Sequence, residues 1–127
     1  MPTLAPVVVV DAANVVGSRP DGWWRDRPGA ARRLHDRLAT AELEGDEVVL
    51  VLEGAARSGQ SPGVVRRVRT VHADGSGDDA IVQEVRTLVG ADAAVLVVTA
   101  DRGLRVRVQA LGADIRPPSW LLAQLPD

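Results

Sequence analysis

The feature that most constrains the fold is a run of four valines, residues 7–10, that ends abruptly at Asp11. A run that is β-branched throughout and too short for a buried helix is typical of a central strand in a parallel sheet, where both faces are covered. Asp11 then lies at the carboxyl end of this strand. In an open α/β sheet, ligands bind at that edge.

Three later apolar runs each lead into an acid: residues 48–52 into Glu53, 64–71 into Asp74, and 95–98 through Thr99 into Asp101. Asp78 and Asp79 stand where the next helix is expected to start. The predicted sheet therefore collects acids along one rim. Such acids repel one another unless a cation neutralises them, and carboxylate oxygens suit Mg²⁺ or Mn²⁺.

The composition predicts one domain, 1–127, because 127 residues of which 46% are hydrophobic can build their own core. Absence of cysteine excludes disulfides and thiolate metal sites, so any metal is expected to have oxygen ligands. No apolar run approaches the ~20 residues of a membrane span, and residues 1–4 lack a signal-peptide pattern. We therefore expect a cytoplasmic protein that makes no membrane contact.

Gly75-Ser76-Gly77 before a helix imitates a dinucleotide-binding fingerprint. Two carboxylates follow where a pyrophosphate would need bare amides, and the motif does not follow the first strand. We therefore reject this interpretation and expect no small-molecule cofactor.

Asp78 has two interpretations. It is a good N-cap, and acids in a first helical turn are favoured by the helix dipole. It also continues the apolar stripe of residues 81–89 inward to the rim, whereas Asp79 points more to the side. Asp78 is thus the first choice as a metal ligand. Asp79 is expected either to support Asp78 without binding the metal directly or to exchange with it as the ligand. Asp101 either caps the next helix, binds metal or does both, and Thr99 can hydrogen-bond a metal-bound water.

Trp23 and Trp24 belong to a predicted loop, residues 15–28, that is rich in Gly, Pro and Arg. Aromatic side chains beside arginines can stack the bases of a single strand and hold its phosphates. The alternative is that the tryptophan pair simply covers the first helix. The arginines that we consider for positioning flanking phosphates are Arg19, Arg25 and Arg57.

A helix is expected over residues 28–43, with Gly45 as its stop. Its exposed arginines, Arg32, Arg33 and Arg37, are interpreted as a solvated face.

Four motifs together resemble the NYN branch of the PIN-like nucleases: Val-Asp-Ala-Ala-Asn-Val at 10–15, Gly-Asp-Asp-Ala-Ile-Val at 77–82, Val-Thr-Ala-Asp-Arg-Gly-Leu-Arg at 98–105 and Leu-Gly-Ala-Asp at 111–114. The resemblance spans nearly the whole chain. It implies a Rossmann-like, three-layer α/β/α domain with a mostly parallel five-stranded sheet. It also implies an acidic cluster that binds Mg²⁺ or Mn²⁺ for RNA cleavage.

Carried over from this family, the metal-binding and catalytic positions are Asp11, Asp78 and Asp101, with Asn14 beside them. Glu53 occupies a place where such proteins often have an acid, and Asp79 is a further candidate. The implied function is a metal-dependent ribonuclease in which a metal-bound water attacks the scissile phosphate in line.

A phosphatase or a receiver domain of the doubly wound type also has acids at its strand ends, but both use a lysine near the phosphate, and this chain has no lysine. A P-loop is excluded for the same reason. The stronger rival is a non-catalytic RNA-binding or partner-binding module that keeps the fold with an inert acidic site. A small domain has no obvious extended RNA groove, so a homodimer that supplies one is a further possibility.

Overall fold

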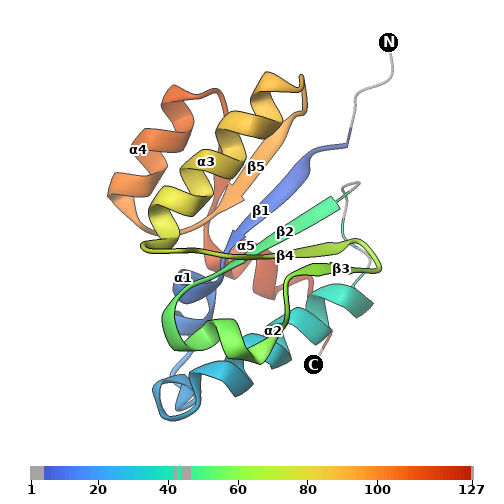
Figure 1. The fold of residues 1–127 in the computed structure, drawn as a ribbon, viewed down its shortest axis with the longest axis vertical. Helices are drawn as coiled ribbons and strands as arrows, with labels where there is room; N and C mark the ends of the chain where they lie inside the picture. Colours follow the sequence, from blue (N-terminus) through green and yellow to red (C-terminus); the bar gives the residue numbers. More distant parts are fainter. Residues whose placement is uncertain (1–4, 42, 44–46, 127) are drawn as a thin grey trace.

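The computed structural model describes residues 5–41, 43 and 47–126, and a sheet forms the centre of this part of the chain (Figure 1). Its six strands are β1 (Val7–Asp11), β2 (Glu47–Leu52), β3 (Gly63–Val65), β4 (Val68–His72), β5 (Val95–Val98) and β6 (Asp114–Arg116). They are ordered β3-β4-β2-β1-β5-β6, so the valine run is central. Neighbouring strands are parallel except β3 and β4, which pair antiparallel.

Helices cover both faces of this sheet. The described helices are α1 (Ala12–Gly17), α2 (Arg27–Thr40), α3 (Gly77–Gly90), α4 (Arg102–Ala110) and α5 (Pro118–Leu122), with short 3-10 turns η1 (Trp23–Arg25) and η2 (Gly54–Gly59). Side chains of α1, α2 and α5 share one core cluster with the sheet, and those of α3 and α4 share the other. The architecture is therefore the expected three-layer α/β/α arrangement.

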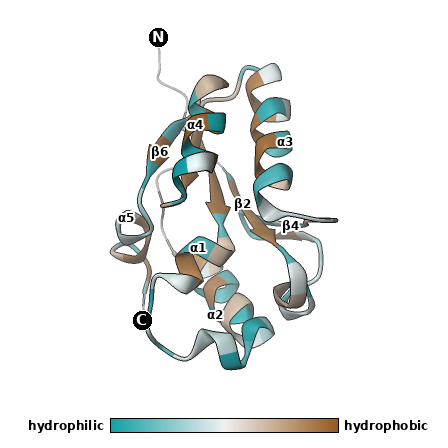
Figure 2. Ribbon diagram, turned by 90° about the vertical axis from the view of Figure 1, so that its left-hand side faces the viewer, coloured by the Kyte–Doolittle hydropathy of each residue, from teal (hydrophilic) through white to brown (hydrophobic). Residues whose placement is uncertain are grey.

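The two core clusters explain why the first four residues of β1, Val7 to Val10, are all apolar. Val8 and Val10 belong to the cluster under α1 and α2, whereas Val7 and Val9 belong to the one under α3 and α4. Successive side chains of a strand point to opposite faces, so a strand covered on both sides has no polar position. Figure 2 shows the resulting hydrophobic strands between the two helical layers.

The prediction of a five-stranded sheet is wrong by one strand. Residues 64–71, expected to form one strand, instead form the antiparallel hairpin β3–β4, in which Val65 pairs with Val68. Arg66 takes a left-handed conformation in the connecting turn, with φ 55°. Two-residue hairpin turns are usually signalled by Asn-Gly or Asp-Gly, and Arg66-Arg67 carries no such signal.

Element boundaries also differ from those expected. Residues 12–17 form α1, so the predicted loop of residues 15–28 begins with a helical segment. The helix expected over residues 28–43 is α2, capped by Asp26, whose Oδ1 accepts a hydrogen bond from the Gly29 N–H at 3.0 Å. Its predicted stop, Gly45, and residues 1–4 lie outside the described residues. Within the described ranges, no helix has the length and apolar character needed to cross a membrane.

Candidate functional site

The candidate site lies where the strand order reverses. The chain runs from β1 to β2 on one side and later returns to β5 on the other side of β1. The carboxyl edge beside such a reversal is where α/β sheets bind ligands. Asp11 ends β1 and Thr99 follows β5, and the Thr99 hydroxyl donates a hydrogen bond to Asp11 Oδ2 at 2.9 Å.

Asp11 is a buried carboxyl group, with only 4% of the residue exposed. Its Oδ1 accepts a hydrogen bond from the Asn14 N–H at 3.3 Å, so Asp11 also caps α1. Burial raises the pKa of Asp11, the hydrogen bonds from Thr99 and Asn14 lower it, and the charges of Asp78 and Glu53 raise it further. The net direction is upward. The fold therefore holds this carboxylate where its charge is disfavoured.

Two polar contacts tie the turn after β1 to the turn after β5, the Thr99–Asp11 hydrogen bond and one between Ala100 and Asn14, and two local contacts order the second turn itself. Thr99 Oγ1 accepts a hydrogen bond from the Asp101 N–H at 3.1 Å, and Asn14 Oδ1 accepts one from the Ala100 N–H at 3.0 Å. Asp101 Oδ1 accepts from the Leu104 N–H at 2.8 Å and thereby caps α4. The capping interpretation of Asp101 is confirmed. These contacts fix Asp11, Asn14, Thr99 and Asp101 relative to one another.

Glu53 reaches the same rim from the end of β2. Its Oε2 accepts a hydrogen bond from the Gly77 N–H at 2.8 Å, at the start of α3. A Cβ atom at position 77 would lie 2.9 Å from the Glu53 carboxyl carbon, which is closer than real Cβ contacts allow. Glycine at position 77 is therefore what lets the carboxylate approach the backbone.

The predicted N-cap role of Asp78 is wrong, because Ser76 caps α3 and accepts a hydrogen bond from the Asp79 N–H at 3.1 Å. Asp78 lies in the first turn and is half-buried. Burial raises the pKa of Asp78, the charges of Asp101 and Glu53 raise it further, and Arg107 lowers it.

Asp79 is exposed and forms a salt bridge with Arg107 at 3.0 Å. The charges of Asp101 and Glu53 therefore act on Asp78, while Asp79 is engaged with a cation of α4. This arrangement agrees with the helical spacing, which predicted that Asp78 faces the rim and that Asp79 points more to the side.

The four rim acids Asp11, Glu53, Asp78 and Asp101 are neighbours, but they are not gathered around one point. Among the residues that the structure describes, no three acidic or histidine side chains are arranged to hold a metal ion. Three of the four carboxylates accept backbone N–H groups instead. The chemistry of these carboxylates still fits a hard divalent cation, because such ions prefer oxygen ligands. A bound cation would also relieve the repulsion among the four negative charges.

A pocket of about 410 Å³ opens beside Glu53 and the start of α1, and Trp23 and Arg27 line it. We call it the Trp23 pocket. The Arg27 guanidinium lies 5.4 Å from the Trp23 ring centre, and Trp24 meets Trp23 edge-on at 6.0 Å. Trp24 is 53% exposed. Neither tryptophan is a core residue, which excludes a simple packing role for Trp24.

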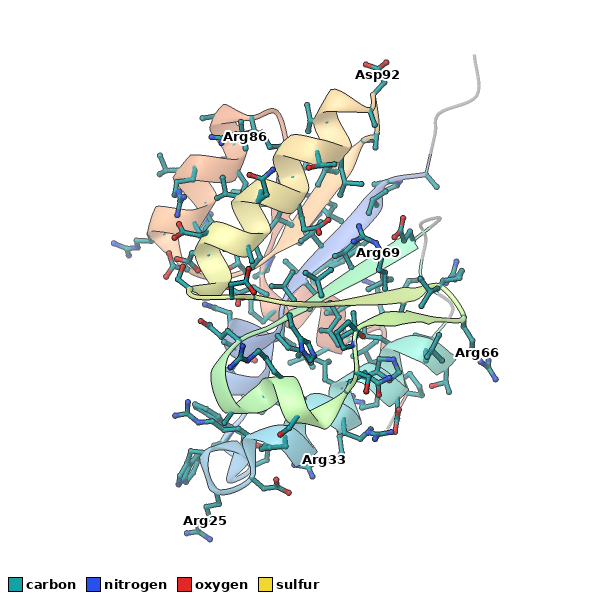
Figure 3. All side chains as sticks on the ribbon, in the orientation of Figure 1. Arg25, Arg33, Arg66, Arg69, Arg86 and Asp92 are labelled. Carbon is teal, nitrogen blue, oxygen red and sulfur yellow. The ribbon has the colours of Figure 1, made fainter. Side chains whose placement is uncertain are left out.

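The three arginines predicted to hold phosphates occupy different places. Arg57 donates to the Gly54 carbonyl at 3.1 Å and to the Ala73 carbonyl at 3.5 Å, near the carboxyl ends of β2 and β4. Arg25 lies over Trp24 at 5.9 Å and projects away from the body of the molecule (Figure 3). Arg19 lines a second pocket between helices.

Arg27 is the residue of the Trp23 pocket that the sequence interpretation missed. It directly precedes Pro28 at the start of α2, so from the sequence alone it was interpreted as a residue of the helix start and not as part of a pocket. The signal that could have found it is the grouping of two tryptophans and two arginines within residues 23–27.

The chain is similar in structure to Rae1 (YacP) from Bacillus subtilis. The crystal structure of that protein aligns with a TM-score of 0.74 at 17% sequence identity, covering 92% of this chain and 71% of that one. A point mutant of Rae1 aligns with a TM-score of 0.75 at 18% identity, covering 93% and 73%. At this identity the similarity shows a shared fold alone. No protein-family model and no curated protein matches the sequence.

Thr99→Val is expected to weaken the site through Asp11. The Thr99 hydrogen bond lowers the pKa of Asp11, so its loss leaves a buried carboxylate without that donor and raises the pKa further. Such a loss costs about 1–3 kcal/mol of unfolding free energy at neutral pH, and less at acidic pH where Asp11 is protonated. Thermal melts at several pH values test this. Thr99→Ser keeps the hydroxyl, and equal melts of the two variants would contradict the assignment.

Proposed function

We propose that this chain is a nuclease that cleaves RNA phosphodiester bonds with the help of Mg²⁺ or Mn²⁺ bound at the rim. The observation that carries the proposal is the buried Asp11 carboxylate, whose pKa is raised and which lies at the strand-order reversal beside further acids. Because the pKa of Asp11 is raised, keeping this carboxyl group ionised at neutral pH costs the protein stability. Carboxylates whose pKa is raised at a ligand-binding edge are typical of functional sites.

Asp11, Asp78 and Asp101 are the residues that we propose to hold the ion, with Glu53 as a fourth acid. When bound, the ion supplies Lewis-acid polarisation of the scissile phosphate and lowers the pKa of a water molecule. Asp79 is a weaker candidate, because its carboxylate is paired with Arg107.

Thr99 and Asn14 act as positioning residues in this proposal. Thr99 orients the Asp11 carboxylate through its hydroxyl, and the Asn14 side chain holds the turn that carries Asp101. Groups that orient metal ligands are worth about 10–100-fold in affinity or activity.

Single-stranded RNA is the substrate class that suits the surroundings of the rim. The Trp23 pocket offers an aromatic face with Arg27 beside it, and Glu53 belongs to both the pocket and the acidic rim. Its volume of about 410 Å³ lies within the ~300–1,000 Å³ range of ligand pockets. An unpaired base that stacks on Trp23 would bring the neighbouring phosphate to the acids. Arg57 belongs to η2, whose residues Gly54 and Ala56 line the Trp23 pocket, so it is placed to contact a further phosphate near that pocket.

The test is incubation of the purified chain with end-labelled single-stranded RNA in Mn²⁺, in Mg²⁺ and in EDTA. Cleavage that needs a divalent ion, and that falls away with Asp101→Asn, is the expected result. Asparagine caps helices as well as aspartate does, so this variant keeps the start of α4. Asp114→Asn on the edge strand β6 is the matched control and also reports any contaminating nuclease.

The rival function is an RNA-binding module with an inert acidic site. It is favoured by the capping roles of Asp11 and Asp101, which give these acids a structural use. This rival predicts RNA binding that is equal in EDTA and Mn²⁺, with intact RNA in every lane.

A further inference from the structure

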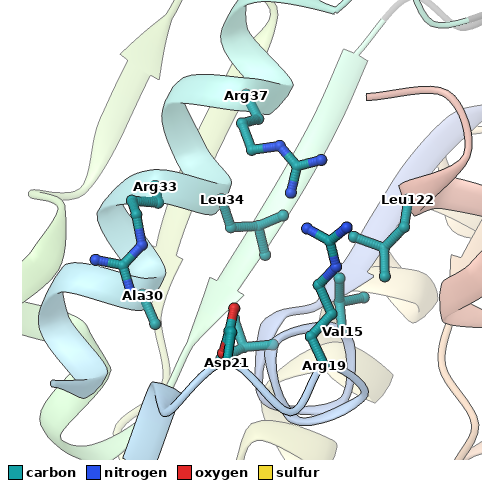
Figure 4. Close-up of a pocket in the computed structure, with 9 residues that line it drawn as sticks. Val15, Arg19, Asp21, Ala30, Arg33, Leu34, Arg37 and Leu122 are labelled. Atoms are coloured by element: carbon teal, nitrogen blue, oxygen red, sulfur yellow. The ribbon is translucent and has the colours of Figure 1, made fainter. Parts of the chain in front are cut away.

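A second pocket, of about 330 Å³, lies between α1, α2 and α5. We call it the arginine pocket, because Arg19, Arg33 and Arg37 line it together with one acid, Asp21. Leu34 of α2 and Leu122 of α5 form part of its apolar floor (Figure 4). Sequence reasoning assigned Arg33 and Arg37 to a solvated helix face, whereas the fold places them at a cavity.

The charges of this pocket are unbalanced. Three guanidinium groups stand against one carboxylate, in a chain whose formal net charge is −2. Asp21 Oδ1 accepts a hydrogen bond from the Trp23 N–H at 3.2 Å. Among the described residues, none of the three arginines forms a salt bridge with an acid.

The arginines are also oriented for a shared ligand. Figure 4 shows the guanidinium groups of Arg19 and Arg37 pointing towards each other over Leu34 and Leu122, while Arg33 lies at the outer edge beside Ala30. Arg37 Nε donates to the Pro126 carbonyl at 2.8 Å, which holds its side chain in place. Two facing guanidinium groups repel unless an anion lies between them, and their planar forks match phosphate oxygens.

The arginine pocket adjoins the Trp23 pocket. Val16 of α1 lines both, so the two cavities lie on either side of one side chain. An RNA strand with a base in the Trp23 pocket therefore has a phosphate-binding group close by, on the other side of Val16. The apolar floor gives the sugar or base next to that phosphate a surface to contact.

We propose that the arginine pocket binds the phosphate group of a nucleotide, and that in the RNA substrate this is a phosphate flanking the cleaved bond. The identity of the strand rests on the proposed nuclease function, whereas the phosphate site itself does not. The same chemistry is offered by a free nucleoside monophosphate, so the two sources need separate measurements.

The first measurement is fluorescence anisotropy of labelled single-stranded RNA in EDTA, where no cleavage is needed. Arg19→Gln with Arg37→Gln is expected to weaken binding about tenfold or more. The slope of log K against log salt should become shallower by roughly 0.7 for each phosphate that the variant no longer neutralises. Arg86→Gln, on α3 in the opposite helical layer, is the matched control. Arg19→Gln alone removes no hydrogen bond within the described chain, so its weaker binding cannot be attributed to misfolding.

The second measurement is calorimetric titration with adenosine 5′-monophosphate and with inorganic phosphate. Arginine-dependent binding of the monophosphate, with RNA affinity unchanged in the double variant, identifies a free nucleotide as the source. Unchanged affinity for RNA, monophosphate and phosphate overturns the proposal. Equal competition by a poly-glutamate peptide also overturns it, because the pocket would then recognise carboxylates of a protein partner.

The outcomes separate this inference from the nuclease proposal. Arginine-dependent RNA binding without any divalent-ion-dependent cleavage leaves the phosphate site standing and removes the nuclease. Cleavage lost in Asp101→Asn, with full affinity for RNA, monophosphate and phosphate in the arginine variants, leaves the nuclease standing and removes the phosphate site.

Discussion

Asp11→Asn is expected to lower the rate of RNA cleavage at least about 100-fold while leaving the fold intact. Residues that only orient a metal ligand are already worth about 10–100-fold, and Asp11 is proposed to be a ligand itself. The variant removes a buried charge whose pKa is raised by burial, so it relieves an unfavourable interaction. Its single amide oxygen can accept either the Thr99 hydroxyl or the Asn14 N–H, so the variant loses one of the two hydrogen bonds that Asp11 accepts.

Initial rates on labelled RNA in Mn²⁺, together with calorimetric titration of Mn²⁺, measure this effect. The matched control is Asp74→Asn, which removes an exposed acid in the turn after β4 and should leave both quantities unchanged. Equal loss in both variants would mean that general negative charge matters and that Asp11 has no special role. Wild-type rates in Asp11→Asn would remove Asp11 from the proposed chemistry.

Asp78→Asn is expected to make the protein more stable at neutral pH and less active. The pKa of Asp78 is raised above its ordinary value of 3.8, so folding disfavours the ionised form. Stability from this group is present below the ordinary pKa and is lost as pH rises through the raised one. Asparagine cannot ionise, so it avoids that loss. We expect a gain of about 0.5–1 kcal/mol, or about 2–4 °C in Tm, at pH 7.

The pH dependence is what distinguishes this explanation from a packing effect. The difference in Tm between Asp78→Asn and wild type should be largest at neutral pH and vanish below the ordinary pKa of 3.8. Asp92→Asn is the control, because this exposed residue has φ 64° and asparagine tolerates that conformation. Added Mn²⁺ should raise the Tm of wild type more than that of the variant. A pH-independent gain would point to packing and contradict the repulsion among the rim acids.

The central strands and the acids that end them could be predicted from the sequence. A strand covered on both faces must be apolar throughout, so the runs ending near Asp11, Glu53 and Thr99 were unambiguous. Helical spacing also predicted that Asp78 faces the rim, whereas Asp79 points more to the side. The hairpin at Arg66 was missed because its turn lacks the residues that usually signal one. Helix α1 was missed because the Gly, Pro and Trp residues that follow it are typical of a loop.

The detailed arrangement of the rim could not be predicted for a different reason. Asp11, Glu53 and Asp101 each have a backbone N–H within reach, and the choice between that donor and a shared ligand depends on side-chain rotamers. The arginine pocket was hidden for a similar reason. Arg33 and Arg37 look like solvated residues on their own helix, and only the packing of α1 and α5 beside α2 turns them towards a cavity.

Asp11 and Asp101 hold the first turns of α1 and α4, and Glu53 holds that of α3. Within the described residues, Asp78 accepts no hydrogen bond and therefore contributes nothing comparable to the fold. If the chain is the nuclease that we propose, a descendant that stopped cleaving RNA would still be selected to keep Asp11, Glu53 and Asp101 for their hydrogen bonds to the helix starts. Position 78 would be free to drift, so under the proposed function it would be the residue that distinguishes a working enzyme from an inherited scaffold in diverged sequences.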